Sequence, residues 1–230
     1  MSKPYEWLLF DVDNTLLDFS RAAELAFFAM LADFDLPVIG DAYAIYQKGN
    51  HQVWTELEAG KITQDELKAK RFQLYLNAQG QEADPQQMNT SFLDNLVDHS
   101  VLIDGCLDLL ESLKVHYRMS IVTNGLKAVQ RPRLQKTHVE HYFHTIIVSE
   151  EIGFAKPQAA FFDVAFREMG YPDRKQTIVI GDSLQSDIRG GLEYGIDTCW
   201  YNPTKVENTS AYQPTMQVSS LEELKDRLLG

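Results

Sequence analysis

Two aspartates follow the first apolar run of the chain. Asp11 and Asp13 come directly after residues 7–10, with only Val12 between them. Side chains two positions apart in an extended segment point to the same side. One carboxylate can therefore attack phosphorus, while the other protonates the leaving oxygen and later deprotonates water. For this pair taken alone, two solvated acids in a surface loop are the alternative.

A second acidic pair follows another apolar run, residues 178–180. Asp182 comes after Gly181, and Asp187 lies a short distance further on. We expect Gly181 to allow a tight turn and Ser183 to cap the next helix. Mg²⁺ prefers hard oxygen ligands and keeps several waters, so carboxylates from two loops suffice to hold it. The alternative is that either acid only complements the positive end of a helix.

Two further polar strand ends are suited to a phosphate group. Thr123, Asn124 and Gly125 end a third apolar run, and a hydroxyl with backbone N–H groups at a helix N-terminus can hold phosphate oxygens. Asn-Gly is also a strong hairpin signal. Lys156, before Pro157, can neutralise phosphate as a point charge, although a lone lysine there is usually an exposed one. Together, the two acidic ends predict a cation site, and the hydroxyl and lysine predict an anion site.

The segments that must position these residues alternate between strand and helix. Short apolar runs without alternation are typical of strands buried on both faces of a parallel sheet. Helical patterns separate them at residues 107–113, 159–169 and 183–194. This order predicts an α/β fold with a doubly wound parallel sheet. The predicted strands are residues 7–10, 119–122, 145–148, 178–180 and 198–201.

One region breaks the alternation. Between residues 19 and 98 the sequence shows helical patterns and no convincing strand. Such a stretch is far longer than an ordinary connection between neighbouring elements. We therefore expect an α/β core domain formed by residues 1–18 and 99–230, and a helical cap domain formed by residues 19–98. The predicted cap helices are residues 21–31, 43–58, 64–77 and 85–99.

Composition excludes several classes of protein. The formal net charge of −12 repels nucleic-acid backbones and anionic membranes, so neither a nucleic-acid polymer nor a membrane is an expected partner. No apolar run reaches the ~18 residues that span a bilayer. Cys106 and Cys199 follow no metal-site or disulfide spacing, which is typical of a reducing compartment. We expect a cytoplasmic protein that is a monomer or a weak homodimer.

The four polar strand ends closely resemble the motifs of the haloacid dehalogenase superfamily of aspartyl phosphotransferases. The matching segments, in the expected order, are Asp11-Val12-Asp13-Asn14-Thr15, Thr123-Asn124-Gly125, Lys156-Pro157 and Gly181-Asp182 with Asp187. The resemblance spans nearly the whole chain. It implies a three-layer core with strand order 5-4-1-2-3, and a small helical cap between the first and second motifs.

The resemblance also implies roles for these residues. Asp11 would form the aspartyl-phosphate and ligate Mg²⁺, and Asp13 would be the general acid and base, with its backbone carbonyl on the metal. Thr123, the Asn124 amide and Gly125 would hold phosphate, with Lys156 stabilising the transferring phosphoryl group. Asp182 and Asp187 would complete the Mg²⁺ site. Dehalogenases of the superfamily lack an acid at the position of Asp13, so its presence favours phosphate-ester hydrolysis, although phosphomutases keep it.

Within the superfamily, the chain resembles bacterial pyrimidine 5′-nucleotidases. The likeness is carried by Trp54, residues 58–63 and Arg71-Phe72 in the predicted cap, and by residues 121–125 and 148–157 in the predicted core. It implies a small phosphorylated metabolite, a nucleoside monophosphate, as the substrate, with Trp54 and Arg71 among the substrate-binding residues. An aromatic ring could stack on a base, and the guanidinium could meet a phosphate or a carbonyl. Packing inside a helix bundle is the alternative for both residues.

Other functions remain open from the sequence alone. A phosphatase or phosphomutase of sugar phosphates, or of other small metabolites, would use the same motifs. A receiver-like signalling module would also place aspartates, a hydroxyl and a lysine on a parallel sheet. It would have little need for the helical insertion or for a leaving-group acid such as Asp13. Multiple turnover distinguishes an enzyme from such a module, because a module accepts phosphate only once.

Overall fold

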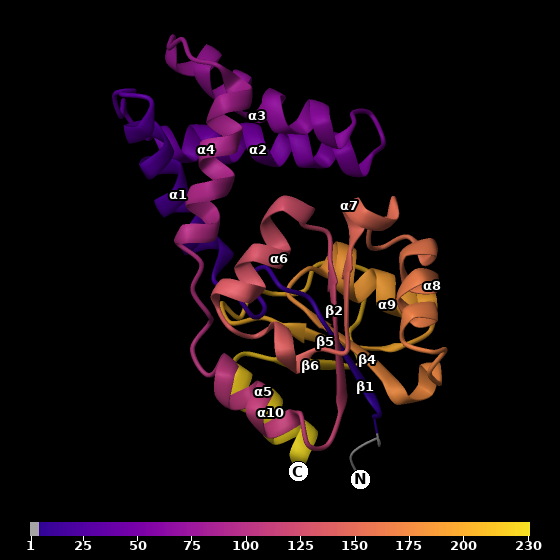
Figure 1. Ribbon diagram of the computed structural model, residues 1–230. Coiled ribbons are helices and arrows are strands. Elements are labelled where there is room, and N and C mark those ends of the chain that lie inside the picture. The colour runs from indigo at the N-terminus through magenta and orange to yellow at the C-terminus, as the bar shows by residue number, and fades with distance from the viewer. Residues whose placement is uncertain (1–4) are drawn as a thin grey trace. The chain divides into compact units, whose positions relative to one another are not determined.

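The computed structural model describes residues 5–230, which form two compact units. One unit contains residues 5–19 and 101–230, and the other contains residues 20–100 (Figure 1). The first four residues of the predicted core domain lie outside the described part of the chain. No helix among the described residues is long and apolar enough to cross a membrane.

The first unit is built on a six-stranded sheet in the order β3-β2-β1-β4-β5-β6, with every neighbouring pair parallel. The first five strands confirm the predicted order, while the edge strand β6 was not predicted. Its middle residue, Gln217, is exposed, so the segment lacks the continuous apolar run of a central strand. The strands are β1 (Trp7–Phe10), β2 (Arg118–Thr123), β3 (Thr145–Val148), β4 (Thr177–Gly181), β5 (Asp197–Tyr201) and β6 (Met216–Val218).

The strands are apolar throughout because both faces of the sheet are covered. Leu8 and Phe10 join one buried cluster, which includes residues of α5 (Cys106–Leu113), α6 (Lys127–Lys136) and α10 (Leu221–Leu229). Trp7 and Leu9 point to the opposite face and join a second cluster with α8 (Ala159–Glu168) and α9 (Arg189–Tyr194). In Figure 1, α5 and α10 lie together on one side of the sheet, and α8 and α9 on the other. This is the predicted doubly wound arrangement.

Short helical turns complete this unit. They are α7 (Ser149–Ile152), the 3₁₀ turns η1 (Glu140–Tyr142) and η2 (Arg174–Gln176), and the π turn η3 (Leu184–Ile188). The helix predicted over residues 183–194 is present from residue 184 to residue 194, between Ser183 as its N-cap and Gly195 as its C-cap, but its first part is the π turn η3 and not an α-helix. In η3 the N–H of Ile188 donates to the carbonyl of Ser183 at 3.1 Å, one residue more than an α-helical bond spans.

The second unit contains helices joined by short loops, and no strand, within residues 20–100. The predicted helices are all present, as α1 (Phe19–Asp33), α2 (Ala42–Glu58), α3 (Gln64–Gln79) and α4 (Pro85–Asp98). Local signals fix their starts: Thr63 and Glu66 form a capping box before α3, and Asp84 caps α4 ahead of Pro85. Stacked and edge-on aromatic rings fill the interior of this unit, namely those of Phe27, Tyr46, Phe72, Tyr75 and Phe92.

Candidate active site

Three aspartates converge at the carboxyl ends of β1 and β4. Asp11, Asp182 and Asp187 each place one carboxylate oxygen within 4.8 Å of the others. The register of the two strands explains this, because Phe10 pairs with Ile180 and the N–H of Asp11 donates to the carbonyl of Ile180 at 2.9 Å. Residues that follow paired positions of adjacent parallel strands emerge side by side. The two predicted acidic loops therefore meet, although they are far apart in the sequence.

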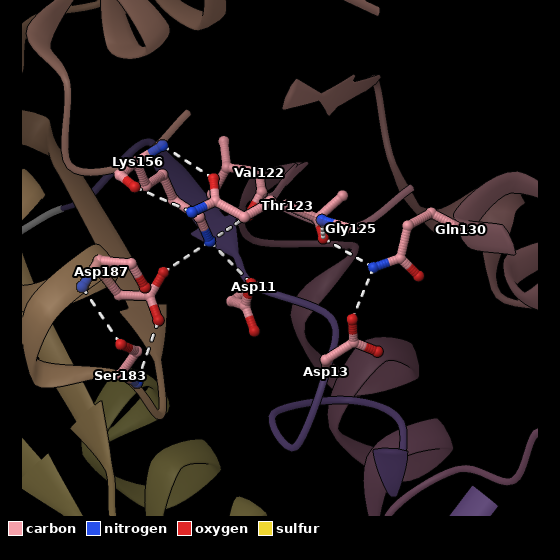
Figure 2. Close-up of polar contacts among 11 residues, drawn as sticks. Asp11, Asp13, Val122, Thr123, Gly125, Gln130, Lys156, Ser183 and Asp187 are labelled. Atoms are coloured by element: carbon pink, nitrogen blue, oxygen red, sulfur yellow. Dashed lines mark hydrogen bonds and ion pairs between the residues drawn. The ribbon is translucent and has the colours of Figure 1, made fainter. Parts of the chain in front are cut away.

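Lys156 lies between two of these acids (Figure 2). Its Nζ donates to Asp11 Oδ1 at 2.7 Å, to Asp187 Oδ1 at 2.6 Å and to the carbonyl of Val122 at 2.6 Å. Burial by itself would lower the pKa of Lys156, but the carboxylates of Asp11 and Asp187 outweigh it and raise that pKa above its ordinary value. The side chain is therefore a fixed, buried cation.

The acidic cluster holds more negative charge than Lys156 balances. Burial raises the pKa of Asp11 well above its usual range; Lys156 opposes the rise, and Asp187 and Asp182 add to it. Burial, followed by the charge of Asp187, raises the pKa of Asp182 to about 7. A divalent cation would favour the charged form of both groups. The carboxylates of Asp11 and Asp187 are buried and that of Asp182 is half-buried. Clustered carboxylate oxygens that lack sufficient positive charge fit Mg²⁺ as the ion they would hold.

Gly181 is required for the position of Asp187. A Cβ atom on Gly181 would lie 2.2 Å from Asp187 Oδ2. That oxygen also accepts the N–H of Ser183 at 3.1 Å, and Ser183 Oγ accepts the N–H of Ser186 at 3.2 Å. Ser183 is thus the predicted cap, but the role of Gly181 is close approach to a side chain rather than a tight turn.

The loop after β2 places its polar groups beside Lys156. Asn124 pairs with the backbone of Lys156 in both directions: Nδ2 donates to the Lys156 carbonyl and Oδ1 accepts the Lys156 N–H, each at 2.8 Å. Thr123 Oγ1 accepts the N–H of Gly125 at 3.1 Å and the side-chain amide of Gln130 at 2.8 Å. With its oxygen accepting two bonds, the hydroxyl keeps its hydrogen to donate. The N–H of Gly125 is used within the loop.

Asp13 has partners of its own, apart from the other three aspartates. Gln130 Nε2 donates to Asp13 Oδ2 at 2.8 Å, and Arg133 Nη1 donates to Asp13 Oδ1 at 2.5 Å. Gln130 and Arg133 were not among the predicted site residues. A signal was present, because both lie on the buried face of α6 together with Val129 and Leu134, and polar residues at helical spacing on an apolar face indicate a buried polar partner.

Trp54 and Arg71, the other predicted site residues, belong to the helical unit. Trp54 is half-buried on α2. Arg71 is buried on α3, where its guanidinium lies 4.9 Å from the ring centroids of both Phe72 and Phe92 and donates to Asn89 Oδ1. Its Nε has no hydrogen-bond partner within the described part of the chain.

The sheet and the polar residues at its strand ends define an α/β protein with its site at the carboxyl edge of the sheet, where such folds bind ligands. Residues 8–201 match the family of haloacid dehalogenase-like hydrolases. The chain belongs to this family, which confirms the predicted membership and the prediction that it is a hydrolytic enzyme.

Several relatives match almost the full length of the chain. It is 39% identical over 222 residues to the putative HAD-hydrolase YfnB of Bacillus subtilis, covering 96% of this chain and 94% of that one. A crystal structure of YfnB bound to magnesium superposes with a TM-score of 0.93 at 38% identity, covering 99% of this chain and 100% of that one. The pyrimidine 5′-nucleotidase YjjG of Escherichia coli is 33% identical, covering 97% and 98% of the two chains. The pyrimidine 5′-nucleotidase PynA of Streptococcus pneumoniae is 36% identical, covering 97% and 95%.

Proposed function

We propose that the chain is a Mg²⁺-dependent phosphomonoester hydrolase that acts through an aspartyl-phosphate on Asp11. The observation that carries the proposal is the contact of Asp11 with Lys156 beside Asp182 and Asp187, with Asp13 held separately. Asp11, Asp182 and Asp187, with the backbone carbonyl of Asp13, would hold the metal. When bound, Mg²⁺ supplies positive charge that offsets the charge of the phosphoryl group. The magnesium-bound structure of YfnB supports this choice of ion.

The reaction uses Asp11 as the nucleophile and Asp13 first as an acid and then as a base. An oxygen of Asp11 attacks phosphorus, the ester P–O bond breaks, and Asp13 gives its proton to the leaving oxygen. Asp13 then takes a proton from water, and the resulting hydroxide attacks phosphorus and releases inorganic phosphate from Asp11. Lys156 and the hydroxyl of Thr123 stabilise charge on the phosphoryl oxygens, with the Asn124 amide beside them. Gly125 shapes that loop.

We propose pyrimidine nucleoside 5′-monophosphates as the substrates. The relatives YjjG and PynA, both named pyrimidine 5′-nucleotidases, support this choice and match nearly the whole chain. Sugar phosphates are the second candidate, because a glyceraldehyde 3-phosphate phosphatase of Methanopyrus kandleri is 26% identical over 83% of this chain. A phosphomutase would keep the same motifs, and would yield a phosphorylated isomer instead of free phosphate.

A phosphate-release screen tests the proposal. Pyrimidine and purine nucleoside monophosphates and small sugar phosphates are each incubated with the protein in Mg²⁺ and in EDTA. We expect many equivalents of phosphate per protein, only in Mg²⁺, with the highest kcat/KM for pyrimidine nucleotides. A single equivalent would identify a receiver-like module. Faster release from a sugar phosphate would overturn the substrate assignment and leave the reaction class intact.

We also propose that Trp54 and Arg71 take part in substrate recognition. Supporting this, no described carboxylate contacts the buried guanidinium of Arg71, whose Nε lacks a partner. A buried cation without an acidic partner is costly, so its place inside the helical unit supports a ligand that pairs with it. We expect Arg71→Met and Trp54→Ala to raise KM for a nucleotide about 10-fold or more, with a small change in kcat. Unchanged KM in both variants would leave these residues as packing of the helical unit.

A further inference from the structure

We propose that Gln130 and Arg133 are positioning residues that hold the carboxylate of Asp13 in the orientation needed for acid–base catalysis. The inference rests on the proposed function, because it assigns Asp13 the proton transfers of phosphoester hydrolysis. Each oxygen of Asp13 has its own donor: Oδ1 accepts from Arg133 Nη1, and Oδ2 accepts from Gln130 Nε2 (Figure 2 shows the second bond). A carboxylate held at both oxygens cannot rotate about its terminal torsion without losing a bond.

The two donors are themselves fixed. Gln130 and Arg133 are almost completely buried, at 1% and 0% exposure, whereas the Asp13 side chain is 27% exposed. They stand three positions apart on α6, so one helical face carries both. Buried side chains on a helix lose most of their rotamer freedom on folding. The partly exposed carboxylate of Asp13 therefore accepts hydrogen bonds from two buried side chains that have little conformational freedom.

A bond between the donors sets the direction of the Gln130 amide. Arg133 Nη1 donates to Gln130 Oε1 at 3.1 Å, which turns the amide nitrogen toward Asp13. The reverse orientation would place the amide oxygen against the carboxylate, where two acceptors repel. Each Asp13 oxygen can accept more than one bond, so a lone pair stays available for the transferred proton.

The same amide links Asp13 to the proposed phosphate site. Gln130 Nε2 also donates to Thr123 Oγ1 at 2.8 Å (Figure 2). One side chain thus sets the spacing between the hydroxyl that would meet the phosphoryl group and the acid that would meet the leaving oxygen. Proton transfer requires a fixed donor within hydrogen-bond reach, and small displacements slow it steeply.

Gly125 provides the space for this side chain. A Cβ atom at residue 125 would lie 2.1 Å from Gln130 Nε2 and 2.5 Å from Gln130 Cδ. The glycine is thus required by the Gln130 side chain, and the two positions act as one unit. The competing explanation is that Gln130 and Arg133 only attach α6 to the loop after β1. A purely structural role affects all substrates alike, whereas a positioning role depends on how much the leaving group needs a proton.

Single-turnover kinetics with two substrates separates these roles. Uridine 5′-monophosphate has a poor, alkoxide leaving group that needs an acid, and p-nitrophenyl phosphate has a good one that does not. The variant is Gln130→Met, which keeps side-chain length and removes both polar ends. The matched control is Gln135→Met, the same substitution at an exposed position of α6. Asp13→Asn is the reference for complete loss of the acid, and thermal unfolding of every variant monitors the fold.

We expect Gln130→Met to slow release of the nucleoside about 10- to 100-fold and release of p-nitrophenol less than about 3-fold. Hydrolysis of the aspartyl-phosphate should slow equally for both substrates, because both leave the same phosphorylated Asp11 after the leaving group has departed. Gln135→Met should match the wild type. Arg133→Met should show the same leaving-group split, meaning a large slowing of nucleoside release and a small slowing of p-nitrophenol release. Arg133→Lys should partly restore nucleoside release. Equal slowing of both release steps, or none, in Gln130→Met would overturn the positioning role.

A double-mutant cycle gives an independent test that does not rely on Arg133. Gly125→Ala should reproduce the leaving-group split, because the new methyl group displaces the Gln130 amide. In the Gln130→Ala background the clash is absent. Adding Gly125→Ala there should slow nucleoside release by a further factor of less than about 3. If the double variant instead lost the product of the two single-variant factors in rate, the coupling between Gly125 and Gln130 would be contradicted. If wild-type protein releases no phosphate from either substrate, the proposed function itself fails, which is a different result from a working enzyme whose variants show no split.

Discussion

Asp11 and Lys156 stand 145 positions apart in the chain, and their side chains meet at 2.7 Å in a buried ion pair. The carbonyl of Val122 and the carboxylate of Asp187 complete the surroundings of the ammonium. Groups from four segments of the chain thus meet at one buried nitrogen, because β3, β2, β1 and β4 are consecutive strands of the sheet. The predictions below follow from this group and its supports.

Asp11→Asn should abolish Mg²⁺-dependent phosphate release, by at least about 10³-fold, while the protein stays folded. The substitution keeps shape and removes the nucleophilic oxygen. Phosphate release and circular dichroism are the measurements. Asp108→Asn, at an exposed acid of α5, serves as the control and should keep wild-type turnover. Normal turnover in Asp11→Asn would show that the nucleophile has been assigned to the wrong residue.

Lys156→Met should lower the free energy of unfolding in EDTA by about 3–5 kcal/mol, since it leaves two buried carboxylates without their cation. Denaturant titration measures this. Added Mg²⁺ should recover part of the loss, because an ion that binds only the folded state stabilises it. Lys225→Met removes an exposed ion pair with Asp108 and should leave the free energy of unfolding nearly unchanged, because solvent screens such pairs. Equal effects of the two substitutions would argue against a buried role for Lys156.

Gly181→Ala should weaken Mg²⁺ binding about 10- to 100-fold, because the methyl group must displace the carboxylate of Asp187. Calorimetric titration of the metal checks this directly. Gly49→Ala is the matched control: a Cβ there meets Leu74 Cβ at an ordinary 3.4 Å, and Mg²⁺ affinity should not change. Undiminished affinity in Gly181→Ala would mean that Asp187 lies outside the metal site.

Cys106 and Cys199 should be inert to thiol reagents in the folded protein. Both are free and buried, and burial raises the pKa of each thiol to about 12. Because the thiolate is the reactive form and this pKa lies above the working pH, only about 1 in 10⁴ thiols is charged at pH 8. Reaction with a disulfide reagent should be absent before unfolding and complete in denaturant. Rapid native reaction would contradict the buried placement.

Much of the fold could be predicted from the sequence because the central strands are continuous apolar runs that end at polar residues. The runs before Asp11, Thr123 and Asp182 fixed both the sheet and the edge at which its polar groups meet. The edge strand β6 could not be found this way, since Gln217 is exposed and interrupts its pattern. The π turn before α9 was missed because a bond from Ser183 to Asp187, and not residue propensity, shapes it.

The candidate site was predicted less completely than the sheet. Residues that end strands were found because their position in the sequence reveals their position in the fold. Gln130 and Arg133 act from within a helix, so their relation to Asp13 arises only when α6 packs beside the loop after β1. The part played by Gly125 depends on the same packing. Contacts between side chains distant in the sequence carry no local pattern.

The reciprocal pairing of Asn124 with the Lys156 backbone has a consequence for how an anion is received. The two hydrogen bonds tie the loop after β2 to the one that follows β3 and α7. The loops that carry the Thr123 hydroxyl and the Lys156 ammonium are therefore already ordered in the folded protein, so binding need not pay the conformational entropy of ordering them. In the proposed function, a phosphoryl group would meet dipoles and charge that need no reorganisation, which is the condition under which such groups stabilise a transition state most strongly.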